Sequence, residues 1–191
     1  GGLKGRYAQG ALDWELSLFD MRFDNLVIRE NVGNLPSLAN AGKERFRGGE
    51  FELDWHACPD LLLLFNYSWH EAKFTDYSRL NGGVLQQLAG KSLELSPRDL
   101  AGAGFIFAPA EGLQASAVVR YVGERFLNKS NTARATAYTT LDASIGYAFS
   151  GWMLALRAKN LTDRRDPVAE SELGDAQFYT LPGRASWIEL S

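Results

Sequence analysis

Cysteine and histidine are scarce in this sequence, which has one Cys and two His among 191 residues. One cysteine excludes a disulfide framework within the chain and a Cys-based zinc or iron–sulfur site. Long apolar runs are also missing, since the longest strongly apolar stretch is 61–65, far shorter than the roughly 18 residues of a transmembrane helix. Positive charge is not in excess, with 20 Lys and Arg against 23 Asp and Glu. These absences exclude a membrane-spanning helix and give no support to a nucleic-acid partner.

Aromatic residues and alternating hydrophobicity are abundant instead. Phe, Trp and Tyr make up 12% of the chain. In 113–121 and 141–149, large apolar residues alternate with small or polar ones, and in 50–57 they alternate largely with acidic ones. Since successive side chains of a strand point to opposite sides, each segment has one apolar and one polar face. Aromatic residues near the ends of the apolar face, such as Tyr121 and Trp152, are typical of the interface girdles of membrane barrels.

The links between the predicted strands alternate in length. Short links fall at 8–10, 58–59, 110–111 and 150, and long links at about 30–39, 77–94, 128–135 and 163–175. This pattern predicts an all-β fold, a portion of an antiparallel transmembrane β-barrel with short periplasmic turns and long extracellular loops. A soluble β-sandwich binding module, whose strands also alternate, is a second interpretation. The nine predicted strands lie near 2–7, 11–29, 40–57, 60–76, 95–109, 112–127, 136–149, 151–162 and 176–191.

The predicted number of strands indicates that the barrel continues beyond this chain. Nine is an odd number, whereas bacterial single-chain barrels have even strand counts. The first strand starts directly at Gly1. We therefore expect 1–191 to be one portion of a barrel whose earlier strands lie upstream.

Six short motifs occur in a characteristic order. They are Asn40-Ala41-Gly42 with Gly48-Gly49-Glu50, and the segments 93–98, 121–126, 140–143, 160–163 and 181–184. Together they resemble the C-terminal part of the β-barrel of TonB-dependent outer-membrane receptors, and the resemblance covers essentially the whole chain.

The resemblance implies a protein of the bacterial outer membrane, surrounded by lipid, whose complete barrel has about 22 strands and encloses a plug domain. It implies energy-coupled uptake of a scarce nutrient, most often a small-molecule cargo such as a ferric siderophore. The energy would come from the inner-membrane TonB complex through a plug that this sequence does not contain. The resemblance implies no cofactor and no catalysis. A passive porin-like outer-membrane barrel is the alternative transport function.

Several motif residues have a direct structural interpretation. Gly42, Gly48, Gly49 and Gly123 are expected where the backbone takes unusual angles or approaches a neighbour closely. Asn160 and Asp163 are suited to bonding the local backbone where a strand becomes a loop. Pro97 and Pro182 stand near predicted strand starts, where proline is tolerated.

Charged residues on the polar strand faces are predicted to line a water-filled lumen. A general-acid cluster is the alternative for the acidic ones, but no nucleophile and base accompany them. An enzymatic barrel would need such a set, so no catalytic residue is predicted. The predicted lumen-facing residues are Glu50, Glu52, Asp54, Arg120, Arg157 and Lys159.

Ligand contacts are expected on the long loops, where polar side chains can bond a cargo and aromatic rings can stack on it. His56 and Cys58 share a strand face, but His70 is the only other histidine, so no metal site is predicted. The candidate ligand-binding residues are Tyr77, Arg79, Asn81, Gln86, Gln87, Asn128, Lys129, Arg134, Phe178 and Tyr179.

Overall fold

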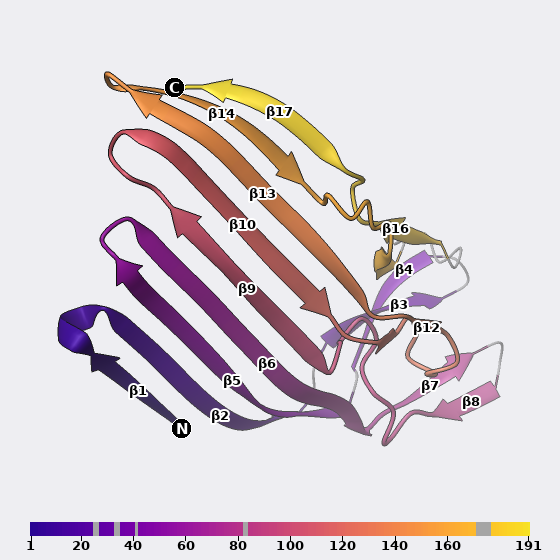
Figure 1. Ribbon diagram of the computed structural model, residues 1–191. Helices are drawn as coiled ribbons and strands as arrows, with labels where there is room; N and C mark the ends of the chain where they lie inside the picture. The colour runs from indigo at the N-terminus through magenta and orange to yellow at the C-terminus, as the bar shows by residue number, and fades with distance from the viewer. Residues whose placement is uncertain (25–26, 33–34, 41, 82–83, 171–176) are drawn as a thin grey trace.

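The computed structural model describes residues 1–24, 27–32, 35–40, 42–81, 84–170 and 177–191. Within these residues, nine long strands form one antiparallel sheet in the order β1-β2-β5-β6-β9-β10-β13-β14-β17 (Figure 1). Each pairs with the strand before and after it along the chain, as expected of a meander. The strands are β1 (Gly2–Tyr7), β2 (Leu12–Asp24), β5 (Lys43–Cys58), β6 (Leu61–Asp76), β9 (Asp99–Phe107), β10 (Gly112–Val122), β13 (Tyr138–Phe149), β14 (Trp152–Lys159) and β17 (Ala185–Leu190).

The long links contain two-stranded hairpins of their own, which the alternation did not predict. Predicted strands that ran into these links are shorter in the structure. β10, for example, pairs with β9 up to Val122, and one more bond in the same register runs from the Gly123 N–H to the Asp99 carbonyl at 2.8 Å. The hairpins are β3 (Val27–Val32) with β4 (Leu35–Asn40), β7 (Ser78–Asn81) with β8 (Val84–Gln87), β11 (Arg125–Phe126) with β12 (Arg134–Ala135), and β15 (Pro167–Glu170) with β16 (Phe178–Thr180).

The predicted alternation of short and long links is confirmed. The 3-10 turn η1 (Ala8–Gly10) and the turns after β5, β9 and β13 lie at one end of the sheet, and the hairpin-bearing loops lie at the other (Figure 1). β1 and β17 are the two edges, so the sheet is open. No helix in the described part of the chain is long and apolar enough to cross a membrane.

One face of the sheet is apolar across all nine strands, except at the loop end of β2, β5 and β6, where it carries charged residues. The registers align Leu113 with Tyr147, and Ile145 with Leu156, which in turn pairs with Ile188. These side chains are exposed: Ile145 by 52%, Leu156 by 50% and Ile188 by 73%. In a soluble sandwich they would pack on a second sheet, so this exposure contradicts the sandwich interpretation.

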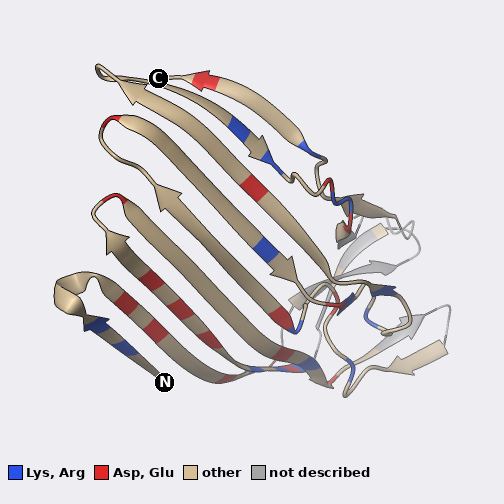
Figure 2. Cartoon of the chain, viewed as in Figure 1, with Lys and Arg blue, Asp and Glu red and all other residues tan. Residues whose placement is uncertain are grey.

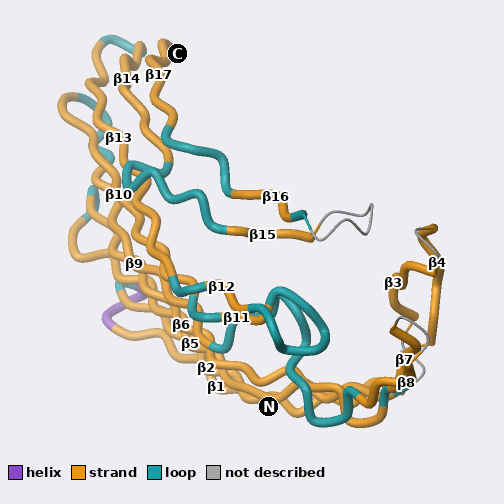
Figure 3. Tube along the Cα trace, turned by 90° about the vertical axis from the view of Figure 1, so that its right-hand side faces the viewer, coloured by secondary structure: helices purple, strands orange, loops and turns teal. Residues whose placement is uncertain are grey.

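The other face is polar and concave. Figure 3 shows the sheet bent into a trough, with the hairpins β11–β12 and β15–β16 over its hollow side. Loop residues bond side chains of the polar face, as where Ser96 Oγ lies 3.2 Å from His70 Nε2. The trough is therefore the wall of a polar lumen, and its convex side carries the apolar band, as in outer-membrane barrels.

Two motif glycines stand where a side chain has no room. Gly42 has a φ of +67°, and a Cβ there would lie 1.8 Å from the carbonyl oxygen of Asp76. A Cβ at Gly48 would lie 2.2 Å from the carbonyl oxygen of Trp69 on β6. The predictions for these positions are confirmed, since β5 can follow β6 this closely only with glycine.

Asn160 joins the end of β14 to two loops. Its Nδ2 donates to the carbonyls of Arg164 and Pro182, each at 2.8 Å, while its Oδ1 accepts from the N–H of Arg164 at 3.0 Å. The side chain is buried, with a residue exposure of 8%. Asp163 Oδ1 accepts from the N–H of Arg184 at 2.8 Å. The predicted bonding of loop backbone by Asn160 and Asp163 is confirmed.

The same contacts perturb the Asp163 carboxyl. The hydrogen bond from the Arg184 backbone is the main cause that holds its pKa below the ordinary value, and the nearby Arg165 guanidinium lowers the pKa further. Asp163 therefore stays ionised below the pH at which a free aspartate takes up a proton.

Candidate functional site

Acidic side chains are concentrated on the lumen side of β2 and β5. The register sets Asp13 opposite Asp54 and Glu15 opposite Glu52, and Glu50 continues the row along β5. Figure 2 shows this concentration as red bands on the two strands. We call these five residues the acidic patch. Like charges directly opposite each other destabilise a sheet, so the patch favours a cationic partner.

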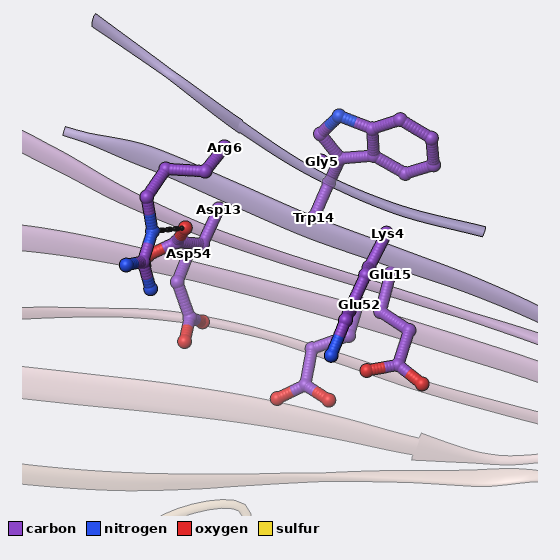
Figure 4. Close-up of a pocket in the computed structure, with 8 residues that line it drawn as sticks. All are labelled: Lys4, Gly5, Arg6, Asp13, Trp14, Glu15, Glu52 and Asp54. Carbon is purple, nitrogen blue, oxygen red and sulfur yellow. Dashed lines mark hydrogen bonds and ion pairs between the residues drawn. The ribbon is translucent and has the colours of Figure 1, made fainter. Parts of the chain in front are cut away.

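The neighbouring strand β1 supplies two cations, which balance only part of the negative charge of the acidic patch. Arg6 Nε lies 2.6 Å from Asp13 Oδ1, and Lys4 stands opposite Glu15. These residues line a cavity of about 580 Å³ together with Glu52 and Asp54. Figure 4 shows the charged side chains extending to one side of the sheet and Trp14 to the other.

The predicted cations on the lumen wall are paired or stacked in the other half of the sheet, on β10 and β14. Arg120 Nη1 lies 2.6 Å from an Asp142 oxygen, and Arg157 Nε lies 2.8 Å from a Glu189 oxygen. The Lys159 ammonium lies 5.9 Å from the centroid of the Trp187 ring. The register puts Arg120, Arg157 and Lys159 on the polar face. The wall thus carries mixed charge, with the acidic excess at β2 and β5.

A small apolar cluster supports the loops at the other end of the lumen. Phe74, Tyr77 and Leu88 form it, and Leu93 packs against it. Tyr77 is 3% exposed, so its ring is covered by the chain itself. The ring of Tyr77 is therefore not accessible to a cargo.

The loop residues between β10 and β13 hold their own loop together or join it to the loop before β9. Asn128 Oδ1 accepts from the N–H of Thr132 at 3.0 Å. Lys129 Nζ lies 2.8 Å from a Glu94 oxygen, and the Arg134 guanidinium lies 4.7 Å from the Phe126 ring centroid.

The other candidate contacts differ in accessibility. Gln86 accepts from Ser130 Oγ at 3.0 Å, Gln87 is exposed, and the side chains of Arg79 and Asn81 lie outside the described residues. Phe178 is half-buried, and Tyr179 is 62% exposed. Gln87, Arg134 and Tyr179 thus remain the accessible candidates, and their ligand role stays a prediction.

Two of the five residues of the acidic patch, Asp13 and Glu15, were not among the predicted lumen-facing residues. In 12–18 the same alternation that marked β5 sets Asp13, Glu15 and Ser17 against Leu12, Trp14, Leu16 and Leu18. The alternation in 12–18 could have predicted Asp13 and Glu15, but only the pairing of β2 with β5 shows that the two acidic rows meet.

No grouping for a metal ion emerges from the described residues. Among them, no three His, Cys, Asp or Glu side chains lie close enough to hold one. His56 and Cys58 are separated by an irregularity in the register of β5 with β6.

Comparisons with known proteins agree with this architecture. The family model described as "TonB dependent receptor-like, beta-barrel" matches residues 1–161. The ferrioxamine receptor of Yersinia enterocolitica is 27% identical over 140 residues, covering 73% of this chain and 19% of the receptor. The ferrioxamine B receptor of Salmonella typhimurium (strain SL1344) is 24% identical over 204 residues, covering 97% of this chain and 28% of the receptor.

A solved structure shows the same fold. The crystal structure of the ferric yersiniabactin uptake receptor FyuA from Yersinia pestis aligns with a TM-score of 0.78 at 23% identity, over 99% of this chain and 28% of that one. The chain thus spans less than a third of the length of the relatives it matches.

Proposed function

Because this chain belongs to the TonB-dependent receptor β-barrel family, we propose that it contributes to the uptake of a ferric siderophore. The chain is an outer-membrane β-barrel sequence, and its apolar face meets lipid. The relatives above are named as ferrioxamine and ferrioxamine B receptors, which supports an iron–chelate cargo. No covalent chemistry is part of the proposal.

The observation that carries the proposal is the division of the nine-stranded sheet into an outward apolar face and a charged lumen wall. Lipid on one side requires every backbone group to bond within the sheet, and the ladder provides this. The open edges β1 and β17 need further strands inside a membrane, since unpaired edges are costly there. We therefore propose that residues 1–191 are the C-terminal portion of a larger barrel.

The acidic patch gives the lumen a specific task in this proposal. Its unbalanced carboxylates face the space that a plug domain would occupy, and basic side chains of a plug would complement them. The plug would in turn connect the barrel to the TonB complex. The accessible loop residues Gln87, Arg134 and Tyr179 would contact the cargo above it.

The cargo proposal is tested by iron uptake. A strain lacking the full-length receptor and its own siderophore systems is given radiolabelled ferric hydroxamates, catecholates and phenolates, with and without TonB. We expect receptor- and TonB-dependent uptake of at least one chelate. Passage that continues without TonB would support the porin-like alternative, and absence of uptake for every chelate would overturn the siderophore proposal.

Reversing charge in the acidic patch should impair transport without preventing barrel insertion. We expect Glu52→Lys with Asp54→Lys in the full-length receptor to lower uptake about tenfold, because like charges would then face the plug. Asp60→Lys with Glu111→Lys is the matched control, since it makes the same charge change at exposed short turns. Equal uptake by both double variants would contradict the role of the patch.

A further inference from the structure

The apolar face changes character at the loop end of β2, β5 and β6. These strands have 13, 16 and 16 residues, compared with 9 in β9 and 11 in β10. Their extensions carry charged residues on the outward face. Asp24 and Lys43 at the far end pair with each other at 3.7 Å, and we call the six that precede them on this face the outer charged cluster. Its members are Asp20, Arg22, Arg45, Arg47, Glu71 and Lys73.

The register arranges these charges in two rows across the three strands. One row alternates in sign, with Arg47 between Asp20 and Glu71. The next row is wholly cationic, with Arg45 opposite both Arg22 and Lys73. Directly opposed side chains have Cβ atoms about 5 Å apart, so the second row places three positive charges side by side.

Arg45 and Lys73 lean towards the carboxylates of the other row, and Arg47 pairs within its own row. Arg45 Nε donates to Asp20 Oδ1 at 2.8 Å. Arg47 Nη2 and Lys73 Nζ each lie 2.5 Å from a different Glu71 oxygen. Two carboxylates do not balance four cations, so the cluster keeps a net charge of about +2 that favours an anion.

The cluster is open to its surroundings. The side chains of Arg45, Arg47 and Lys73 are 35%, 49% and 40% exposed. They line a cavity of about 340 Å³ with Glu71. An arginine has five N–H donors in a planar fork, so each guanidinium has donors left for a second acceptor.

The position of the cluster relative to the membrane identifies the anion. Trp69 stands two residues before Glu71 on the same face of β6, and the Arg98 guanidinium lies 5.4 Å from the centroid of its ring. Tryptophan at the end of an apolar band marks the interface between acyl chains and headgroups. The cluster lies just beyond this ring, at the height of the headgroups of the outer leaflet.

We propose that the outer charged cluster binds phosphate groups of the glycolipid in the outer leaflet, lipopolysaccharide. Its acyl chains would cover the apolar band, while its phosphates accept hydrogen bonds from Arg45, Arg22 and Lys73. Guanidinium groups bind phosphate with two parallel hydrogen bonds, which suits this role. The inference rests on the outer-membrane location of the barrel and does not depend on its cargo.

The test measures binding of bisphosphorylated lipid A to the purified full-length receptor in detergent. We expect Arg45→Gln with Lys73→Gln to weaken binding about tenfold, because two charge-assisted contacts are lost. Lys4→Gln with Arg157→Gln removes the same charge from the lumen face and should leave lipid A binding unchanged. Dephosphorylated lipid A should bind the unaltered receptor about tenfold more weakly.

A variant with the opposite expected result separates binding from a folding defect. Asp20→Asn with Glu71→Gln removes the carboxylates that compete for the same cations, so lipid A should bind several-fold more tightly. Weaker binding by this variant would overturn the proposal. The proposal would also be overturned if the outward and the lumen-face double variants weakened lipid A binding equally. Binding of dephosphorylated lipid A as tight as that of the bisphosphorylated form would overturn it as well.

Discussion

Replacing Ile145 by arginine is expected to destabilise the folded barrel by about 2–3 kcal/mol, the cost of a charge on the lipid face away from the interfaces. Ile145 lies on β13 between Leu156 and Ala115 of the adjacent strands and is 52% exposed. Water cannot reach a charge there. The measurement is unfolding of the full-length receptor by guanidinium in phospholipid vesicles, followed by tryptophan fluorescence.

The neighbouring residue provides a matched control. Ser144 faces the lumen, where its Oγ lies 2.7 Å from Ser116 Oγ. Ser144→Arg loses that hydrogen bond and stands opposite Arg157, but it keeps its charge in a polar space, so we expect a cost of only about 1–1.5 kcal/mol. A larger cost for Ser144→Arg than for Ile145→Arg would reverse the assignment of the two faces.

The second large effect is expected at Asn160. Asn160→Asp keeps the oxygen that accepts from Arg164 N–H but turns the two bonds donated to the Arg164 and Pro182 carbonyls into repulsions. Each buried group left without its partner costs about 1–3 kcal/mol, so we expect a loss of about 2–4 kcal/mol. Hydrogen exchange at 160–166 and 181–184 in the full-length receptor should become much faster.

The pH dependence of this variant has a definite sign. Burial raises the pKa of the new carboxyl, so lowering the pH protonates it and restores one donor. The defect should therefore shrink as the pH falls. Asn128→Asp serves as the control, because the Asn128 Oδ1 acceptor of the Thr132 N–H is retained. A loss of stability in Asn160→Asp that equals the loss in Asn128→Asp, or that grows at low pH, would contradict this account.

The nine long strands could be predicted from the sequence because two different media act on alternate residues. Leu141, Ile145 and Phe149 all meet lipid, so selection for bulk at every second position is strong and local. The hairpins within the long loops lack this constraint. β7 and β8 pair with each other, and Leu88 next to them packs on Phe74 and Tyr77, contacts that no period in the sequence displays.

The candidate site could be predicted only where strand geometry fixed it. Glu50, Glu52 and Asp54 follow from alternation alone, and the register sets all three on one face of the sheet. The burial of Tyr77 could not be foreseen, because it depends on contact with Phe74, earlier in the chain, and with Leu88, across the β7–β8 hairpin. Loop residues are positioned by such tertiary contacts, whereas strand residues are positioned by the ladder.

The central claim is that the bulky side chains of this sheet meet lipid and the small and charged ones meet water. It is tested most directly by spin labels at single cysteines along 141–149 in the full-length receptor in bilayers, with Cys58 replaced by serine. The account predicts high oxygen accessibility at odd positions and high accessibility to a water-soluble nickel complex at even ones. Odd positions accessible to neither reagent would mean that the apolar face packs on protein, and the claim would be wrong.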